Sequence, residues 1–364
     1  MRDDHPPKVA HMSVLNHAAL PALGAAVLFG ASTPFAKQLI GDGLAASSPF
    51  LLAGLLYLGS GVGLALIRLI RDRGWKATHL PANEWPWLVG AIVFGGVLGP
   101  VLLMVGLAHT AAATASLFLT LEAVLTAVLA WWVFKENADR RIVLGMLLIV
   151  AGGAVLAWPT GGATASGIGP LALAGACLAW AIDNNLTRKV SASDALFIAG
   201  IKGLVAGCVN TGLGLALGSA LPTAALLSTA MLIGFLGYGV SLVLFVLALR
   251  GLGTARTGAY FSTAPFVGAA IAIAFFGEPT SPAFWLASVL MAAGVWLHLT
   301  EHHAHDHHHA ELLHAHPHRH DEHHQHTHDF AWDGVEPHSH AHQHTALKHQ
   351  HAHFPDVHHQ HSHS

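Results

Sequence analysis

Three consecutive polar residues follow an apolar stretch in the middle of the chain: Asp183, Asn184 and Asn185 come directly after GPLALAGACLAWAI. A carboxylate and two amides can bind ions, donate or accept hydrogen bonds and exchange protons. Two further ionisable residues, Glu122 and Lys202, also lie inside apolar stretches. Charged groups in such surroundings are costly unless they are paired or hydrated. These five residues are therefore the first candidates for binding or chemistry.

The composition indicates a membrane protein. Hydrophobic residues make up 53% of the 364 residues and charged residues only 10%. Runs long enough to cross the hydrocarbon core, about 17 to 25 residues each, alternate with short polar or Gly/Pro-rich stretches. We therefore predict an all-α integral membrane protein with ten transmembrane helices. Their predicted ranges are 18–40, 49–70, 85–108, 111–134, 142–158, 167–186, 195–217, 224–249, 254–276 and 283–299.

Lysine and arginine residues indicate the orientation. Those outside the helices follow spans two, four, six and eight or lie in the terminal segments, whereas the alternate loops, such as GDGLAASS and PTGGATAS, contain none. Positively charged loops stay in the cytoplasm. We expect a multi-pass protein of the inner (plasma) membrane with both termini in the cytoplasm.

The two halves of the membrane part resemble each other. Shifting the sequence by 142 places 106–158 over 248–300, and shifting it by 151 pairs Phe29 with Trp180. Each half has five spans, an odd number, so the second half must enter the membrane from the opposite side. This is an inverted repeat, the architecture of many secondary transporters.

Three motifs carry a resemblance to a known family. FGASTPFAK in the first helix, TLEAVLTAVLAWWVFKE in the fourth and STAPFVGAAIAIAFFGEP in the ninth resemble the EamA-type transporters of the drug/metabolite transporter superfamily. The family's Glu-Pro pair in helix four reads Glu122-Ala123 here. The resemblance implies a small-molecule substrate and alternating access. The expected divisions are a cytoplasmic segment at 1–17, five-helix repeats at 18–158 and 159–300, and a tail at 301–364.

Both copies of the first helix carry polar or helix-weakening residues at the matching place. Ser32, Thr33 and Pro34 align with the Asp-Asn-Asn triplet under the shift of 151. Polar groups inside a membrane are tolerated where they line a cavity, so both triplets are predicted to interrupt their helices and line a transport pathway. The predicted pathway residues are Ser32, Thr33, Pro34, Glu122, Asp183, Asn184, Asn185, Lys202 and Tyr260.

The ionisable candidates leave alternatives open. Asp183 and Lys202 are expected at similar depth, about 10 Å from the cytoplasmic end of successive helices. A pair between them could be a structural strut or a switch that substrate or a proton opens, or Asp183 could instead lie in the interface beside basic residues. Glu122 is expected near the midplane, where a carboxyl group could carry a proton or hydrogen-bond to a neighbouring helix. Glu278, at a loop edge, is interpreted as a solvated or capping group.

The tail from 301 to 364 is of a different kind. It contains 25 of the 31 histidines and nine acidic residues, and it lacks the apolar content for a core, so we expect it to be disordered when free. Neutral imidazole binds zinc, nickel and cobalt, which predicts a divalent-metal-binding, regulatory tail. A solubilising extension with incidental affinity is the alternative. The expected ligands are His323, His324, His326, His328, His338, His340, His342, His344, His358, His359, His361 and His363.

Other functional classes fit the sequence less well. The spans contain no GxSxG, no HExxH and no clustered aspartates, so we expect neither an enzyme nor a required cofactor, and nucleic acid is not an expected partner. We predict a secondary transporter that exports a small metabolite or drug-like compound. Its expected partners are that substrate, the bilayer and divalent metal ions. Whether two copies of the chain form a homodimer is a question that the sequence leaves open. The alternative is a divalent transition-metal transporter or a metal-sensing membrane protein.

Overall fold

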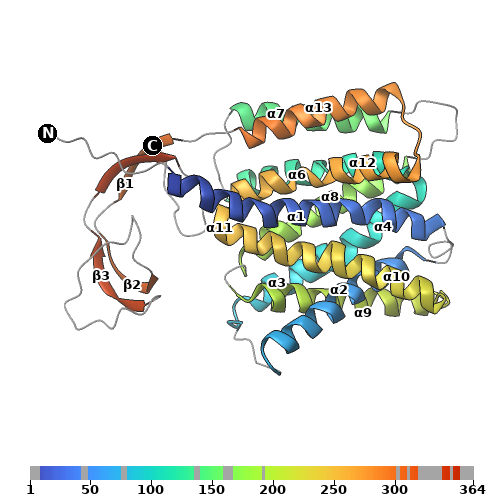
Figure 1. The fold of residues 1–364 in the computed structure, drawn as a ribbon, viewed down its shortest axis with the longest axis horizontal. Helices are drawn as coiled ribbons and strands as arrows, with labels where there is room; N and C mark the ends of the chain where they lie inside the picture. The colour runs from blue at the N-terminus through green and yellow to red at the C-terminus, as the bar shows by residue number, and fades with distance from the viewer. Residues whose placement is uncertain are drawn as a thin grey trace. The chain divides into compact units, whose positions relative to one another are not determined.

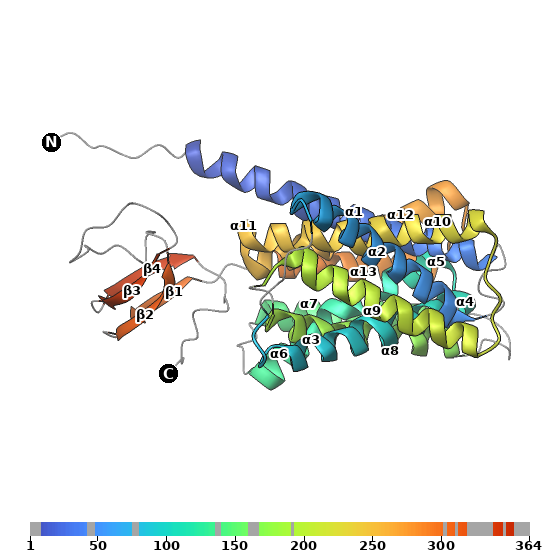
Figure 2. The same cartoon turned by 90° about the horizontal axis from the view of Figure 1, so that it is seen from below.

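The chain forms two compact units, Met1–Glu301 and His302–Ser364, in a computed structural model. The residues that the structure describes are 9–41, 48–74, 80–134, 140–158, 167–190, 193–300, 304–309, 312–318, 338–344 and 347–352. Helices make up the regular structure of the first unit and lie side by side along a common direction (Figures 1 and 2). They are α1 (Val9–Leu39), α2 (Pro49–Arg71), α3 (Trp85–Ala91), η2 (Ile92–Leu98), α4 (Gly99–His109), α5 (Ala112–Phe118), α6 (Leu121–Phe134), α7 (Arg140–Ala157), α8 (Ile168–Arg188), α9 (Ala195–Ala216), α10 (Ala224–Gly234), η3 (Phe235–Val240), α11 (Ser241–Phe261), α12 (Ala264–Phe276) and α13 (Pro282–Leu299).

These helices confirm the predicted all-α membrane fold. Seven helical segments among the described residues are long and apolar enough to cross a bilayer, and two shorter apolar helices lie in α12 and α13. The 21 residues of α8 are long enough as well, although they include the polar Asp-Asn-Asn triplet. Several crossings consist of consecutive pieces: α3, η2 and α4 form the third, α5 and α6 the fourth, and α10, η3 and the start of α11 the eighth.

The chain reverses direction within α11. Its helical pattern continues from Ser241 to Phe261, yet the rings of Phe245 and Phe261 lie 4.9 Å apart. Sixteen residues of straight helix would separate them by about 24 Å along the axis. The turn between the eighth and ninth crossings therefore lies inside this element, as the sequence predicts.

Helix packing follows the inverted repeat. The second and seventh crossings, α2 and α9, pack on each other, and so do the fifth and tenth, α7 and α13. The first crossing, α1, packs on α11 and α12, while the sixth, α8, packs on α4 and α6. A two-fold axis between the repeats explains this pattern. It places the second and the fifth helix of one repeat against the same helices of the other. It also gives the first helix of each repeat contacts with the third and fourth helices of the other repeat, that is, the first crossing with the eighth and ninth and the sixth crossing with the third and fourth.

Small residues allow the closest of these approaches. A Cβ atom added at Gly203 of α9 would lie 2.6 Å from the backbone nitrogen of Gly61 in α2. Real Cβ atoms do not come so near, so glycine is needed where the two helices cross.

Each repeat contains a π-helical segment at the matching place. The shift of 142 that aligns the repeats moves Ile92–Leu98, which is η2, onto residues 234–240, and η3 is Phe235–Val240. The fourth and ninth crossings also break at matching places, at Leu119–Thr120 and at Ser262–Thr263. The break in the first repeat forms without the family's proline. Because π-helical segments are frequent at functional sites, both of these places are candidates for one.

The first helix of each repeat is not interrupted, contrary to the expectation. α1 runs through Pro34, and α8 runs through its polar triplet. Asn185 explains part of this, because its amide donates to the carbonyl oxygen of Ala181 at 2.9 Å and so stays within the helix.

The His-rich unit contains paired strands where we expected disorder. β1 (Ala304–His309) pairs antiparallel with β4 (Leu347–Ala352), and β2 (Leu312–His318) pairs antiparallel with β3 (His338–His344). Histidine alternates with other residues in β3 and in most of β2, and a period of two suits an extended chain. The difference from the expectation is therefore a matter of backbone pairing that composition does not reveal.

Candidate functional site

A cavity lies between the two repeats. It encloses about 710 Å³ of empty space, counting its open side. Both repeats contribute to it, from the first, second, fourth, sixth, seventh, eighth and ninth crossings. The lining residues are Phe29, Tyr57, Ser60, Glu122, Trp180, Asp183, Asn184, Ala199, Lys202, Gly203, Gly237, Tyr238, Ser241, Leu242, Phe245 and Phe261.

A buried ion pair lies at this cavity. Lys202 of α9 donates from its Nζ to Oδ2 of Asp183 in α8, and the two residues are only 7% and 5% exposed. The other carboxylate oxygen of Asp183 accepts a hydrogen bond from the hydroxyl of Thr187 at 2.9 Å. Asp183 also packs against Gly95 of η2, where any Cβ would overlap its carboxylate. The pair is thus enclosed on several sides, and breaking it would leave a buried charge without its partner.

Glu122 lies in the first turn of α6, just after the break in the fourth crossing. Its Oε1 accepts a hydrogen bond from the side-chain amide of Asn184 at 2.8 Å. The N-terminus of a helix favours a negative charge, and a carboxyl group there can take up or release a proton. Glu122 and the ion pair therefore line the same cavity from the fourth, sixth and seventh crossings.

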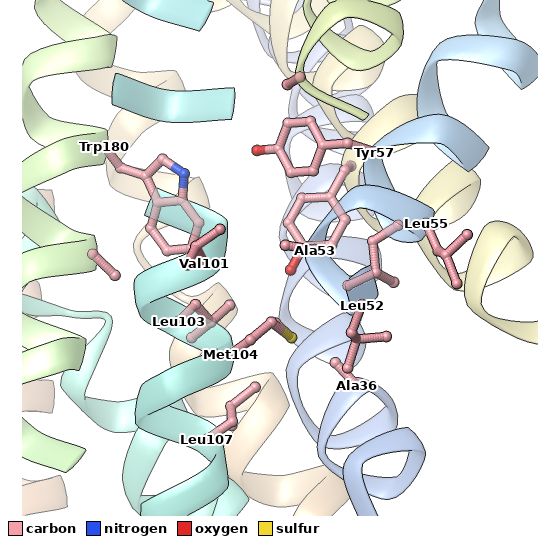
Figure 3. Packing of buried hydrophobic residues seen from close by; sticks show 14 of the residues in the cluster. Ala36, Leu52, Ala53, Leu55, Tyr57, Val101, Leu103, Met104, Leu107 and Trp180 are labelled. Atoms are coloured by element: carbon pink, nitrogen blue, oxygen red, sulfur yellow. The ribbon is translucent and has the colours of Figure 1, made fainter. Parts of the chain in front are cut away.

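Two carbonyl groups of η2 accept side-chain hydrogen bonds. Pro100 has no N–H group, so it cannot donate to the carbonyls one turn before it. The carbonyl of Gly95 accepts from the Tyr57 hydroxyl at 2.8 Å and from the Trp180 indole at 3.0 Å. The carbonyl of Gly96 accepts from the Asn210 amide at 3.1 Å. Figure 3 shows Tyr57 and Trp180 approaching from α2 and α8 with their polar ends toward each other.

Aromatic rings form the apolar part of the lining. Phe29 is central: its ring centroid lies 6.1 Å from that of Trp180, 5.8 Å from Tyr238 and 5.2 Å from Phe261. Phe29 and Trp180 are the pair that the shift of 151 aligns. Because counterparts from the two repeats touch only near the axis that relates them, the cavity lies at that axis.

The end of the bundle that the predicted orientation places outside is joined across the repeats. Glu278, just after α12, accepts hydrogen bonds from the backbone amides of Ala112 and Ala113 at 2.8 and 2.7 Å, and so caps α5. Nearby, Lys37 of α1 donates to the carbonyl of Leu107 at 2.5 Å. Of the two interpretations of Glu278, solvated or capping, the structure therefore shows the cap.

A second group of charges lies at the other end of the bundle, where α2 ends and α9 begins. Arg71 donates to Oδ2 of Asp194 at 2.7 Å, and Asp194 also caps α9 through the Leu196 amide at 3.0 Å. Burial acts to raise the pKa of Asp194, but the bonds from Arg71 and Leu196 outweigh it and hold the pKa below its ordinary value. This contact fastens a helix start and is not part of the cavity.

The predicted pathway residues divide into two groups. Glu122, Asp183, Asn184 and Lys202 come together at the cavity. The others are not among its lining residues: Ser32 and Thr33 are buried in helix contacts, and Pro34 continues α1. The Asn185 amide donates to the carbonyls of Ala181 in α8 and Thr126 in α6, and Tyr260 packs beside Ala22 and Ala248. The expected metal ligands His338, His340, His342 and His344 lie in β3, and those at 323–328 and 358–363 lie outside the described residues.

Sequence reasoning missed the aromatic lining and the role of Tyr57. One signal was present, because the chain has only three tyrosines and all of them fall within predicted spans. Two of these, Tyr57 and Tyr238, line the cavity.

Comparisons with known proteins agree with this architecture. The EamA-like transporter family matches the chain twice, at residues 17–158 and 167–300. An "Uncharacterized transporter" of Methanothermobacter thermautotrophicus is 27% identical over 292 residues, which cover 75% of this chain and 83% of the relative. A "Probable 4-amino-4-deoxy-L-arabinose-phosphoundecaprenol flippase subunit ArnE" of Pseudomonas aeruginosa is 39% identical over 115 residues, 30% of this chain and 96% of its own.

A solved structure shares the fold. It is described as "Crystal structure of protein", is 20% identical in sequence and superposes with a TM-score of 0.58 over 77% of this chain and 95% of its own.

Proposed function

This chain belongs to the EamA-like transporter family, and we propose that it is a secondary transporter that exports a small organic compound by alternating access. The membrane that we propose is the inner (plasma) membrane, with both termini in the cytoplasm. The absence of lysine and arginine from alternate loops supports this orientation.

The observation that carries the proposal is the cavity at the axis between the repeats. Inverted-repeat transporters bind substrate near the midplane at the interface of the repeats, and there each repeat can rock against the other. Here that place holds a buried ion pair, a second acidic residue and a ring of aromatic side chains. Aromatic faces and a few convergent polar groups suit a small organic ligand with an apolar body and a polar end.

We propose that Glu122 carries a proton in exchange for substrate. Its carboxyl group lies at the cavity and is bound by one neutral amide, so it can change protonation without breaking an ion pair. Asp183, in contrast, is bound to Lys202. Proton uptake at Glu122 from one side and release to the other would couple flux to the proton gradient.

Transport in everted vesicles tests these proposals. Amino acids, nucleosides, small drug-like compounds and divalent metal ions should be screened with and without a proton gradient, and uptake of one organic class is expected. Glu122→Gln should abolish gradient-driven uptake while leaving the protein folded. The matched control is Glu84→Gln, since Glu84 precedes α3 and does not line the cavity. Full gradient-driven flux in Glu122→Gln would contradict coupling through this residue.

The His-rich unit is the basis for two candidate roles. We propose that it binds zinc, nickel or cobalt ions exchangeably and regulates transport, because neutral imidazoles suit these metals. The second candidate is a transporter or sensor of the metal itself, and the concentration of 25 histidines in one segment favours it. A chain truncated after Thr300 distinguishes them. Flux of the organic substrate that persists without metal response supports regulation, whereas metal flux that disappears with the tail supports the second candidate.

A further inference from the structure

The cavity reaches close to the cytoplasmic ends of its helices and stops short of their outer ends, those that the predicted orientation places outside. Ala199 and Asn184 line it only four residues from the cytoplasmic ends of α9 and α8, about 6 Å along each axis. The lining residue nearest the outer end of its crossing is Tyr57, eight residues after Pro49 and thus about 12 Å from the start of α2. The cavity therefore extends toward the cytoplasm.

Glu278 joins the outer ends of the two repeats. It follows α12 of the second repeat, and its carboxylate oxygens accept from the backbone amides of Ala112 and Ala113 in the first, at 2.8 and 2.7 Å. A charged acceptor makes stronger bonds than a neutral one, and a helix start favours a negative charge. Lys37 of α1 interacts electrostatically with Glu278, while its Nζ donates to the carbonyl of Leu107. One carboxylate and one ammonium group thus link the outer ends of α1, α4, α5 and α12.

Apolar packing accompanies these charges. Leu117 of α5 is fully buried, in one cluster with Ala269 and Ala272 of α12. The rings of Phe35 in α1 and Phe276 in α12 meet edge to face, with their centroids 5.4 Å apart. The outer ends of α1, α5 and α12 therefore form a packed seal.

The fourth crossing has a place to bend where α5 ends. It breaks at Leu119–Thr120, so that α5 packs on α12 and α1 while α6 packs on α8 and α7. Hinges are commonly a few residues at the end of an element that absorb changes in backbone angles. The hydroxyls of Ser116 in α5 and Thr120 at the break are buried and lack a hydrogen-bond partner among the described residues. Because buried polar groups normally have one, a second arrangement of α5 that supplies partners accounts for both.

From these contacts we propose that Glu278 closes an outer gate: its bonds to Ala112 and Ala113 hold the cavity shut toward the outside, and they break each time the carrier opens outward. The inference rests on the proposed alternating access and goes further, because it names the contact that holds one of the two states. Lys37 is a positioning residue, whose charge holds the Glu278 carboxylate against α5.

Access to the cavity from outside tests the gate without requiring a substrate. In a Cys177→Ser and Cys208→Ser background, Leu242→Cys places a reporter thiol at a partly exposed position of the cavity lining. A charged, membrane-impermeant methanethiosulfonate is applied to right-side-out vesicles and separately to everted vesicles. The reporter should react at least tenfold faster from the cytoplasmic side. Adding Glu278→Gln should raise the rate from outside at least fivefold, because the amide keeps one acceptor and loses the charge.

Ser281→Ala is the matched control at the same end of the bundle. Ser281 caps α13 by accepting from the Phe284 amide at 3.1 Å, and this cap lies within the second repeat. Its loss should change the outside rate less than twofold. Lys37→Met should raise the outside rate by less than Glu278→Gln does, and Lys37→Arg should restore the slow rate, as expected for a positioning charge.

The outcomes separate this inference from the proposed function. Equal outside rates in Glu278→Gln and Ser281→Ala overturn the gate, and so does a reporter that reacts equally from both sides before Glu278 is changed. An equal rise from both sides in Glu278→Gln indicates general loosening of the bundle and overturns it as well. Flux of organic substrates is measured independently, so its absence contradicts the proposed transport while side-specific reaction rates still support the gate.

Discussion

Asp183 of α8 packs against Gly95 of η2, and Ser32 of α1 packs against Gly237 of η3. The same shifts that align the repeats relate these two contacts, so the inverted repeats build the same helix junction on each side of the axis. The first junction holds a buried carboxylate paired with Lys202, whereas the second holds a hydroxyl that donates to the carbonyl of Phe29 at 2.6 Å. The repeat thus determines the backbone arrangement, and divergence of single residues determines which side is charged.

The surroundings of the two π-helical segments, η2 and η3, also differ between the charged and the uncharged side. On the charged side, Pro100 leaves carbonyls of η2 to be bound by Tyr57, Trp180 and Asn210. On the other side, Leu242 occupies the position corresponding to Pro100, and Ser241 after η3 donates to the carbonyl of Ala25 in α1 at 2.9 Å. We expect the charged side to be the more rigid of the two.

The largest expected effect comes from removing the charge itself. Asp183→Ala leaves Lys202 buried without its partner, which costs about 3 to 5 kcal/mol, so folded yield and transport should both be lost. Ser32→Ala at the related position should retain both. Yield of monodisperse protein and vesicle transport measure the difference.

The double variant Asp183→Ala with Lys202→Met is the control for charge. It removes both partners, so it should recover much of the folded yield but not transport. If Asp183→Ala alone proves as well folded as Ser32→Ala, the two sides are energetically equivalent and the comparison is wrong.

Alanine substitutions at the two junction glycines, Gly95 and Gly237, should differ in whether shortening the neighbouring side chain restores transport. A Cβ at Gly237 would lie 2.5 Å from the Cβ of Ser32, so Gly237→Ala should impair transport and Ser32→Gly should restore it. A Cβ at Gly95 would overlap the Asp183 carboxylate, which cannot be shortened without losing the charge. Initial transport rates decide this. They are compared between Gly95→Ala with and without Asp183→Gly, and between Gly237→Ala with and without Ser32→Gly. Equal rescue by a shortened partner on both sides would contradict the prediction.

A smaller effect is expected at Pro100. Pro100→Ala adds an N–H that competes with Tyr57, Trp180 and Asn210 for the carbonyls of η2, and an altered hydrogen bond is worth about 1 kcal/mol. We expect a shift of a few degrees in the thermal midpoint and slower transport. Pro282→Ala serves as control, because Pro282 begins α13, where the N–H is free in any case. Identical midpoints for the two variants would argue against a role for the missing donor.

The smallest effect is expected for the charges outside the bilayer. The pKa of Asp194 is lower in the folded protein than in the unfolded chain, so its contribution is present above the unfolded value and is lost as pH falls below about 4. Asp194→Asn keeps a capping acceptor and removes the charge, which should cost less than about 1 kcal/mol. Thermal midpoints between pH 3 and 7 should converge for the two proteins at the acid end. A constant difference across that range would exclude titration of Asp194 as the cause.

Much of the fold follows from the sequence because it depends on local composition and on the internal repeat. Apolar runs predict the crossings, and a charge inside one, such as Lys202, has few ways to be satisfied other than a nearby acid. The bond between Asn184 and Glu122 was not predictable, since it joins residues 62 positions apart and depends on how α6 begins after its break. The aromatic lining was missed for a similar reason: periodicity cannot distinguish a ring at a cavity from a ring in a packed core. Paired strands in the tail depend on register, which composition does not contain.

The cap that Glu278 provides for α5 has a consequence for how sequences of this kind can vary. Its two donors are main-chain N–H groups, so any residue other than proline at Ala112 or Ala113 retains them. The strength with which the two repeats hold together through this cap can therefore change through one position only. Because Ala112 and Ala113 are also buried, only small residues fit at the start of α5, and the residue after Gly277 is the position where a substitution can remove the cap while the helix packing stays in place.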